Sequence, residues 1–165
     1  MKEKLNIALV AHDARKQELI EWVKYNVNTL KQHNLYATGT TGKLIEKVGE
    51  EWNGEWDEYE KVYENGPFYG KVNKLLSGPL GGDSEIGTMI AHGEIDVLIF
   101  FCDNLITQGH QQDVGALSRL ASLYNIAFAT NRTTADHILT SSLFNNPEYE
   151  RITPSVIGRY KNRVL

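Results

Sequence analysis

The sequence predicts an α/β fold, a single-domain three-layer sandwich in which a mainly parallel sheet is flanked by helices. Short apolar runs alternate with amphipathic helical patterns along the whole chain. The apolar runs are continuous rather than alternating, which is typical of parallel strands buried on both faces. With 165 residues, 41% of them hydrophobic, the chain has enough interior for one ordinary domain. We therefore expect residues 1–165 to form a single domain.

Five apolar runs are predicted to be strands, and helical periodicity follows each of them. The clearest run is 95–101. After the first run, apolar residues at helical spacing predict one continuous helix that ends near residue 33. We read residues 38–42 as a turn before the second helix. The predicted strands are residues 5–11, 35–38, 72–76, 95–101 and 126–130.

Residues 50–70 differ in character from the rest of the chain and are interpreted as an acidic and aromatic insertion. Their aromatic side chains recur at helical spacing, so they would share one face, with the acidic residues on the other. We expect this face to pack on the body or on a neighbouring subunit rather than to stack on a ligand. The aromatic residues are Trp52, Trp56, Tyr59 and Tyr63.

Charge and composition exclude several function classes. The net charge of −4 argues against general nucleic-acid binding. No apolar run approaches the roughly 20 residues that a membrane span needs. No signal peptide is evident, and Cys102 has no second cysteine with which to form an internal disulfide. These features predict a cytoplasmic protein that works without a membrane or nucleic-acid partner.

The most unusual stretch is residues 76–83, LSGPLGGD. Its glycines and its proline exclude a regular helix or strand, so it predicts a tight loop between a strand and a helix. Free backbone N–H groups at a helix start attract anions. Asp83 is then either an ordinary helix N-cap or a carboxylate that faces a bound ligand.

Four loops follow predicted strands: residues 12–16, 38–42, 77–83 and 103–113. Ligands bind at the carboxyl ends of the strands in such folds, so these loops should converge on one edge of the sheet. The hydroxyls, glycine N–H groups and lysine that they carry suit a phosphate monoester. These candidate phosphate-binding residues are Lys16, Thr38, Gly39, Thr40, Thr41, Gly42, Ser77 and Gly78.

Known nucleotide motifs are absent from the sequence. A Walker A motif would need Gly at position 37 and Ser or Thr at position 44, where the chain has Ala37 and Leu44. No G-x-G-x-x-G dinucleotide motif occurs. The anion is therefore expected to be one phosphate on a small molecule.

The same loops carry acids and bases, which points to proton transfer. Carboxylates beside a phosphate pocket weaken anion binding, so a plain phosphate-binding module gains nothing from them, whereas a proton-transfer enzyme does. Alternatively, Asp13 and Asp113 are helix caps, Asp103 caps a loop, and His12 is a core histidine. A metal site is not favoured, because no H-E-x-x-H motif or cysteine pair occurs. The set comprises Asp13, Asp83, Asp103, Asp113, His12 and His110.

Several segments of the chain resemble the methylglyoxal synthases, in the order in which that family carries them. They are ALVAHD at 8–13 with Lys16, LYATGTTG at 35–42, LSGPLGGD at 76–83, IFF at 99–101 with Asp103, His110 with Asp113, and ATN at 129–131. The resemblance implies a methylglyoxal synthase-like fold of Rossmann-type topology. It also implies conversion of dihydroxyacetone phosphate to methylglyoxal and inorganic phosphate without a metal or organic cofactor. A homohexamer that phosphate inhibits is implied as well.

The resemblance also implies residue roles. Asp83 would be the catalytic base, and His110 would bind the substrate oxygens and relay protons. The supporting acids would be Asp13, Asp103 and Asp113. The substrate and phosphate contacts would be His12, Lys16, residues 38–41, Ser77 and Gly78.

The chain departs from the family pattern in three places. The insertion at 50–70 lengthens one connection, and the loop around Gly109 and His110 lacks the prolines that the family usually has there. The family's C-terminal arginine could be Arg159 or Arg163. Two other readings remain: an effector-binding module without turnover, and a sugar-phosphate isomerase that retains the phosphate.

Overall fold

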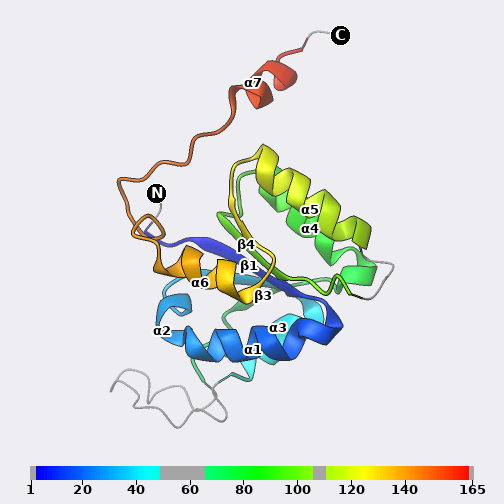
Figure 1. The fold of residues 1–165 in the computed structure, drawn as a ribbon, viewed down its shortest axis with the longest axis vertical. Helices are drawn as coiled ribbons and strands as arrows, with labels where there is room; N and C mark the ends of the chain where they lie inside the picture. The colour runs from blue at the N-terminus through cyan, green and yellow to red at the C-terminus, as the bar shows by residue number, and fades with distance from the viewer. Residues whose placement is uncertain (1–2, 49–65, 106–110, 164–165) are drawn as a thin grey trace.

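The computed structural model of the chain describes residues 3–48, 66–105 and 111–163, with the backbone alone for residues 111–113. Five parallel strands form one sheet in the order β3-β2-β1-β4-β5. Helices lie on both sides of it (Figure 1). The predicted α/β fold class is thus confirmed. The strands are β1 (Asn6–Ala11), β2 (Asn34–Thr38), β3 (Val72–Leu75), β4 (Val97–Phe101) and β5 (Ala127–Ala129).

The helices alternate with the strands as the periodicity predicts. They are α1 (Lys16–Tyr25), α2 (Val27–Leu30), α3 (Gly39–Glu46), α4 (Gly82–Ala91), α5 (Gln111–Leu123), α6 (Arg132–Thr140) and α7 (Ser155–Lys161). Two 3₁₀ turns, η1 (Asp13–Arg15) and η3 (Gly78–Leu80), precede α1 and α4. Within the described ranges, no helix combines the length and apolar character needed to cross a membrane.

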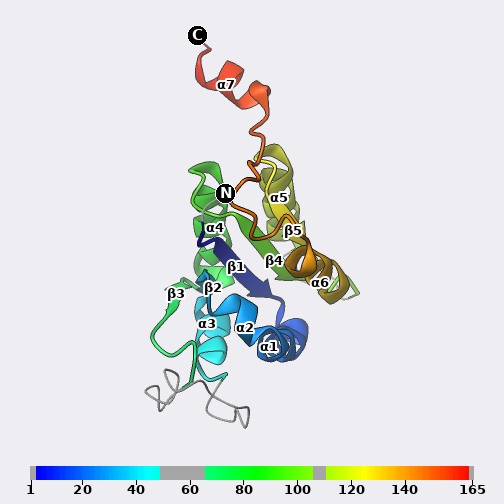
Figure 2. The same ribbon diagram turned by 90° about the vertical axis from the view of Figure 1, so that its left-hand side faces the viewer.

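The sheet is buried on both faces, which explains why its strands are continuously apolar. Along β1, Leu9 and its alternate neighbours face a core formed with α1, α2, α3 and α6. Ala8 and Val10 face a second core formed with α4 and α5. Figure 2 shows these two helical layers on opposite sides of the sheet. The alternation of strand side chains between the two cores therefore follows the pleat.

The chain between β1 and β2 forms two helices rather than the predicted single one. The break falls at Asn26, whose side-chain amide donates a hydrogen bond to the Trp22 carbonyl oxygen at 2.9 Å. An asparagine that bonds to the preceding turn competes with continuation of the helix. The apolar periodicity continues through this point because both short helices bury their apolar side chains on the same side of the sheet.

Two loop predictions also need correction. Residues 39–42 are the first turn of α3, not a turn before it. Helical structure also enters the 76–83 stretch, because Gly78–Leu80 form a 3₁₀ turn and α4 begins at Gly82. Asp83 is not the helix cap: the N-cap is Gly81, whose φ of 107° is one that glycine tolerates. Asp83 instead lies in the first turn of α4.

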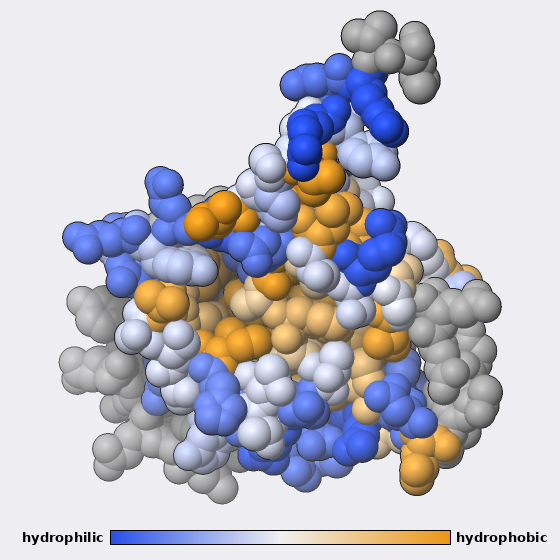
Figure 3. All heavy atoms as spheres, turned by 45° about the horizontal axis from the view of Figure 1, so that its top comes forward, coloured by the Kyte–Doolittle hydropathy of each residue, from blue (hydrophilic) through white to orange (hydrophobic). Residues whose placement is uncertain are grey.

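The C-terminal segment extends away from the body and ends in α7 (Figures 1 and 2). In Figure 3, polar side chains cover its tip, while apolar side chains gather at its base. Ile152 and Tyr160 in this segment are 77% and 66% exposed. These are large apolar side chains for an isolated chain to leave in water.

His33 connects the start of β1 to the C-terminal part of the chain. Its Nδ1 accepts a hydrogen bond from the Leu5 backbone N–H at 3.2 Å. Its ring packs edge-on against Phe144, with centroids 5.3 Å apart. Burial, with a smaller contribution from the charge of Lys4, lowers the pKa of His33 below 6.5. Protonation of this imidazole is therefore unfavourable in the folded protein.

We predict that His33 makes the protein less stable as the pH falls from about 7 toward 5. Above pH 6.5 the imidazole is neutral in both the folded and the unfolded state. Below it the unfolded chain binds the proton more readily, so the free energy of unfolding decreases. The measurement is urea denaturation at several pH values. His33→Gln should show a shallower pH dependence than the wild type.

His137→Gln is the matched control, because His137 is exposed near the end of α6. It should leave the pH dependence of the wild type unchanged. Equal slopes for His33→Gln and the wild type would contradict the prediction.

Candidate active site

A cavity of about 250 Å³ lies at the carboxyl ends of the strands. Residues that follow β1, β2 and β3 come together in its wall, as expected from the order of loops in a parallel sheet. The C-terminal residues of β1 and β4 also contribute. The lining residues are Val10, Ala11, His12, Asp13, Lys16, Thr38, Thr40, Ser77, Gly78, Pro79, Asp83 and Phe100.

Helix N-termini point their backbone N–H groups toward this end of the sheet. Helices α1, α3 and α4 all begin within the segments that line the cavity. The positive end of each helix dipole favours an anion there. Thr40 and Ser77 add hydroxyl groups to this wall. A small anionic group therefore suits this site.

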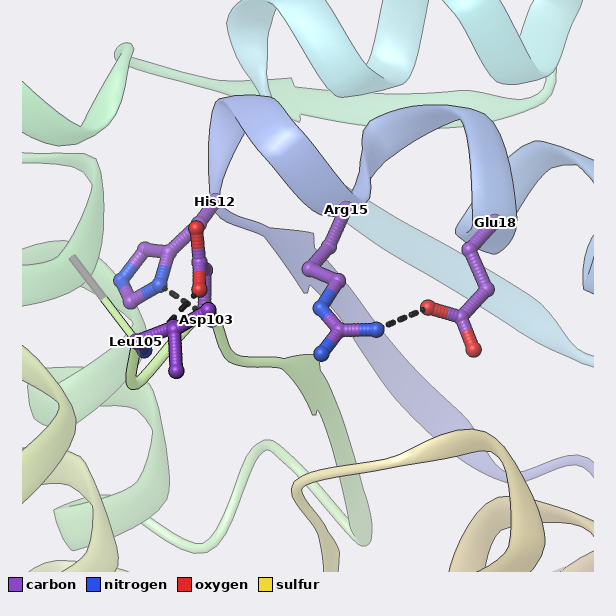
Figure 4. Close-up of polar contacts among 5 residues, drawn as sticks. All are labelled: His12, Arg15, Glu18, Asp103 and Leu105. Atoms are coloured by element: carbon purple, nitrogen blue, oxygen red, sulfur yellow. Dashed lines mark hydrogen bonds and ion pairs between the residues drawn. The ribbon is translucent and has the colours of Figure 1, made fainter.

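His12 presents a defined tautomer to the cavity. It is 6% exposed, and its Nδ1 accepts a hydrogen bond from the Asp103 backbone N–H at 2.8 Å (Figure 4). In the neutral imidazole the proton must then lie on Nε2. Among the described residues Nε2 has no hydrogen-bond partner. The ring thus keeps one N–H donor available to a bound ligand.

Lys16 supplies a positive charge to the cavity wall. Its side chain is 22% exposed, and its Nζ donates a hydrogen bond to Asp13 Oδ1 at 2.7 Å. The neighbouring Arg15 forms an ion pair with Glu18 along the helix (Figure 4). Lys16, not Arg15, is therefore the cation of this loop that lines the cavity.

Asp103 is buried beside the site but does not line the cavity. Its carboxylate accepts a hydrogen bond from the Leu105 backbone N–H at 3.1 Å, which shapes the loop after β4 (Figure 4). Its own backbone N–H holds His12. The observed contacts of Asp103 thus orient its neighbours. The adjacent Cys102 is also buried, and burial raises the pKa of its thiol to about 11.

The cavity wall around Asp83 depends on a close backbone approach. A Cβ on Gly82 would overlap the Leu76 carbonyl oxygen. The Gly82 N–H also donates a hydrogen bond to the Ser77 carbonyl oxygen at 3.1 Å. A Cβ on Gly78 would lie 3.3 Å from Asp83 Oδ2. The carboxylate of Asp83 therefore lies directly over the glycine of the phosphate-binding loop that the sequence predicted.

Not every residue singled out in the sequence reaches the cavity. Gly39 starts α3, and Thr41 is fully buried, where its hydroxyl accepts a hydrogen bond from Thr38 at 3.4 Å. His110 and the side chain of Asp113 lie outside the described residues, as does most of the 50–70 insertion.

Four cavity residues were not expected from the sequence: Val10, Ala11, Pro79 and Phe100. They are apolar, so no chemical signal marked them. Their position at a strand end or within the glycine-rich loop is the one feature that could have identified them. In the described part of the chain, no cluster of three or more His, Cys, Asp or Glu residues could hold a metal ion.

Comparison with known families and structures agrees with this fold. The model of the MGS-like domain family matches residues 59–130. A solved structure of methylglyoxal synthase from Elizabethkingia anophelis superposes with a TM-score of 0.78 at 39% identity. That match covers 100% of this chain and 95% of the other.

Curated relatives are similar over nearly their whole length. Methylglyoxal synthase from Maridesulfovibrio salexigens is 48% identical over 151 residues, which cover 92% of each chain. Methylglyoxal synthase from Coxiella burnetii is 46% identical over 159 residues, which cover 96% of each chain.

We predict that Gly82→Ala distorts the cavity. The methyl group would push the start of α4 away from Leu76 and displace Asp83 from Gly78. Overpacking of this kind costs about 1–3 kcal/mol of stability. A displacement near 1 Å lowers turnover roughly 100-fold. Thermal unfolding and the turnover rate are the measurements.

Gly115→Ala is the control substitution, because none of the described residues has an atom within 4 Å of a Cβ at that helical position. It should leave turnover unchanged and stabilise the protein by about 0.5–1 kcal/mol. Gly82→Ala with wild-type turnover would show that the close approach is dispensable.

Proposed function

The chain belongs to the methylglyoxal synthase family and is a phosphate-eliminating lyase, and from that premise we propose how its site works. The substrate is dihydroxyacetone phosphate, and the products are methylglyoxal and inorganic phosphate. The observation that carries the assignment of roles is the placement of Asp83 over Gly78 in a cavity lined by phosphate-binding groups. The proposed base then lies next to the proposed phosphate site.

The phosphate group binds against the helix starts. Thr40, Ser77 and Gly78 line the cavity beside Lys16, and together they offer hydroxyls, a backbone N–H and a positive charge. Such groups suit a phosphate monoester. Thr38 and Thr41 hold each other, and Gly39 starts α3, so these three shape the binding wall. The role we propose for Thr38, Gly39 and Thr41 is therefore to keep the binding wall in shape.

Asp83 acts as the general base. It removes a proton from the carbon that bears the hydroxyl group, and the electron pair moves onto the carbonyl oxygen to give an enediolate. The Nε2–H of His12 donates a hydrogen bond to that oxygen as its negative charge develops. A neutral donor is preferable here, because it stabilises the charge without being consumed as an acid. The further roles of His110 and Asp113 in proton relay follow from the family motif.

Phosphate elimination then separates this reaction from an isomerisation. The enediolate electrons expel the phosphate when the breaking C–O bond is perpendicular to the enediolate plane. This leaves the enol of methylglyoxal, which becomes methylglyoxal when a proton is added to its terminal carbon. The loop of Ser77 and Gly78 is held by backbone hydrogen bonds, so it can fix the phosphate out of that plane. Lys16 stabilises the departing charge, and Asp13 keeps the lysine in place. Asp103 supports the reaction by orienting His12.

The quaternary structure and location follow the same family. We propose a homohexamer of single-domain chains in the cytoplasm, inhibited by inorganic phosphate. The projecting C-terminal segment supports assembly, because its exposed Ile152 and Tyr160 would be covered by a neighbouring copy. The same segment carries Arg159 and Arg163, either of which could reach a neighbouring subunit.

The direct test is to add dihydroxyacetone phosphate to the purified protein in the presence of a chelator. Methylglyoxal and phosphate should appear in equal amounts. Asp83→Asn should lower turnover by roughly 100-fold or more, the usual contribution of a general base, and still bind inorganic phosphate. Isothermal titration measures that binding.

Each contrary outcome has a clear meaning. An isomerised sugar phosphate without free phosphate would indicate an isomerase. Phosphate binding without any product would indicate an effector-binding module. Full activity in Asp83→Asn would remove Asp83 as the base.

We expect the intact protein to have the light-scattering mass of six 18.6-kDa chains. A chain that ends at Arg151 should form a smaller species, because it lacks the exposed apolar side chains of the C-terminal segment. Tyr25→Ser is the control, since Tyr25 is 81% exposed on α1 and lies outside that segment. An unchanged hexamer in the truncated protein would show that other surfaces hold it together.

A further inference from the structure

The backbone of Leu76 joins the two halves of the site. Leu76 immediately follows β3 and precedes Ser77. Its carbonyl oxygen accepts a hydrogen bond from the Gly39 N–H at 3.4 Å, which connects it to the start of α3. The same oxygen is in close contact with Gly82, at the start of α4. The position of this one peptide therefore affects both the phosphate-binding loop and the helix that carries Asp83.

Glu85 bonds the other backbone polar group of Leu76, its N–H. The Leu76 backbone N–H donates a hydrogen bond to Glu85 Oε1 at 3.0 Å. Glu85 lies in the first turn of α4, two residues after Asp83, and its own N–H donates to the Gly81 carbonyl oxygen at 3.0 Å. One residue thus bridges the entry and the exit of the 76–82 loop. The loop between these two attachment points contains Ser77 and Gly78.

We propose that Glu85 is a positioning residue for the reaction: its carboxylate oxygen sets the distance between Asp83 and the phosphate-binding loop. This inference rests on the proposed function, because the distance matters only if Asp83 is the base and Ser77 and Gly78 bind the phosphate. Glu85 is not among the residues that line the cavity. Its effect passes through Leu76 to the loop and through the first turn of α4 to Asp83.

The proposed role depends on a hydrogen-bond acceptor at the correct reach, not on negative charge. Glutamine keeps the length of glutamate and an acceptor oxygen but has no charge. Aspartate keeps the charge but is one methylene shorter, so its carboxylate falls short of the Leu76 N–H. A role in helix-dipole stabilisation or in electrostatics would give the opposite ranking of these two variants.

The experiment compares Glu85→Gln, Glu85→Asp and Glu85→Ala in the dihydroxyacetone phosphate assay, with kcat and KM measured separately. Glu85→Gln should keep kcat within about 3-fold of the wild type. Glu85→Asp and Glu85→Ala should lose roughly 10- to 100-fold in kcat, the scale of effect of a displaced catalytic group. The Kd for inorganic phosphate should change much less than kcat. Glu94→Ala is the control, because Glu94 is a half-exposed carboxylate in the connection after α4.

The comparison of Glu85→Gln with Glu85→Asp tests the proposal even if Glu85→Ala does not fold. Active Glu85→Asp with impaired Glu85→Gln would overturn the proposal in favour of charge. Equal kcat in all variants would show that the hydrogen bond is not needed. A wild-type protein that makes no methylglyoxal would instead overturn the proposed function itself, and this inference with it.

Discussion

Burial of the central strands on both faces is the constraint on which the rest of the structure depends. Strands β1 and β4 alternate their side chains between two cores, each covered by its own set of helices. The helices that cover the two faces are crossover connections, and such connections join strands that run parallel. Parallel strands then end at the same edge, and the loops that follow them meet there. The cavity is a consequence of how the core is built.

Backbone groups contribute much of the positive potential at this edge of the sheet. The starts of α1, α3 and α4 bring the positive ends of three helix dipoles to one small cavity, so a chain with a net charge of −4 can still attract an anion locally. The close approach of Gly82 to Leu76 places the start of α4 against the phosphate-binding loop. Asp83, the base we propose, therefore lies beside the 76–82 loop without any long side chain having to reach across.

Neighbouring groups determine what each side chain can do. The Asp103 N–H leaves His12 with its donor on Nε2, and Asp13 holds Lys16 at the cavity wall. Glu85 plays the corresponding part for the 76–82 loop. In each case a residue outside the reacting centre fixes the tautomer, direction or distance of one inside it. Such support is what lets a small site separate phosphate elimination from simple isomerisation.

The sequence by itself determined the fold class, because continuous apolar runs and intervening helical periodicity already require a parallel sheet with two covered faces. It also identified four residues of the cavity wall, because the loops that follow buried parallel strands meet at one edge of the sheet. These residues are His12, Lys16, Ser77 and Asp83. Tertiary structure alone decided which of the other polar residues reach the cavity. Thr41 and Asp103 turn inward to bond with neighbours, and the apolar Val10 and Phe100 line the wall. Local sequence could not show this, because side-chain direction at a strand end depends on contacts with segments far away in the chain. The bond from Leu76 to Glu85 is of the same kind, since a loop conformation, not a motif, brings its two ends together.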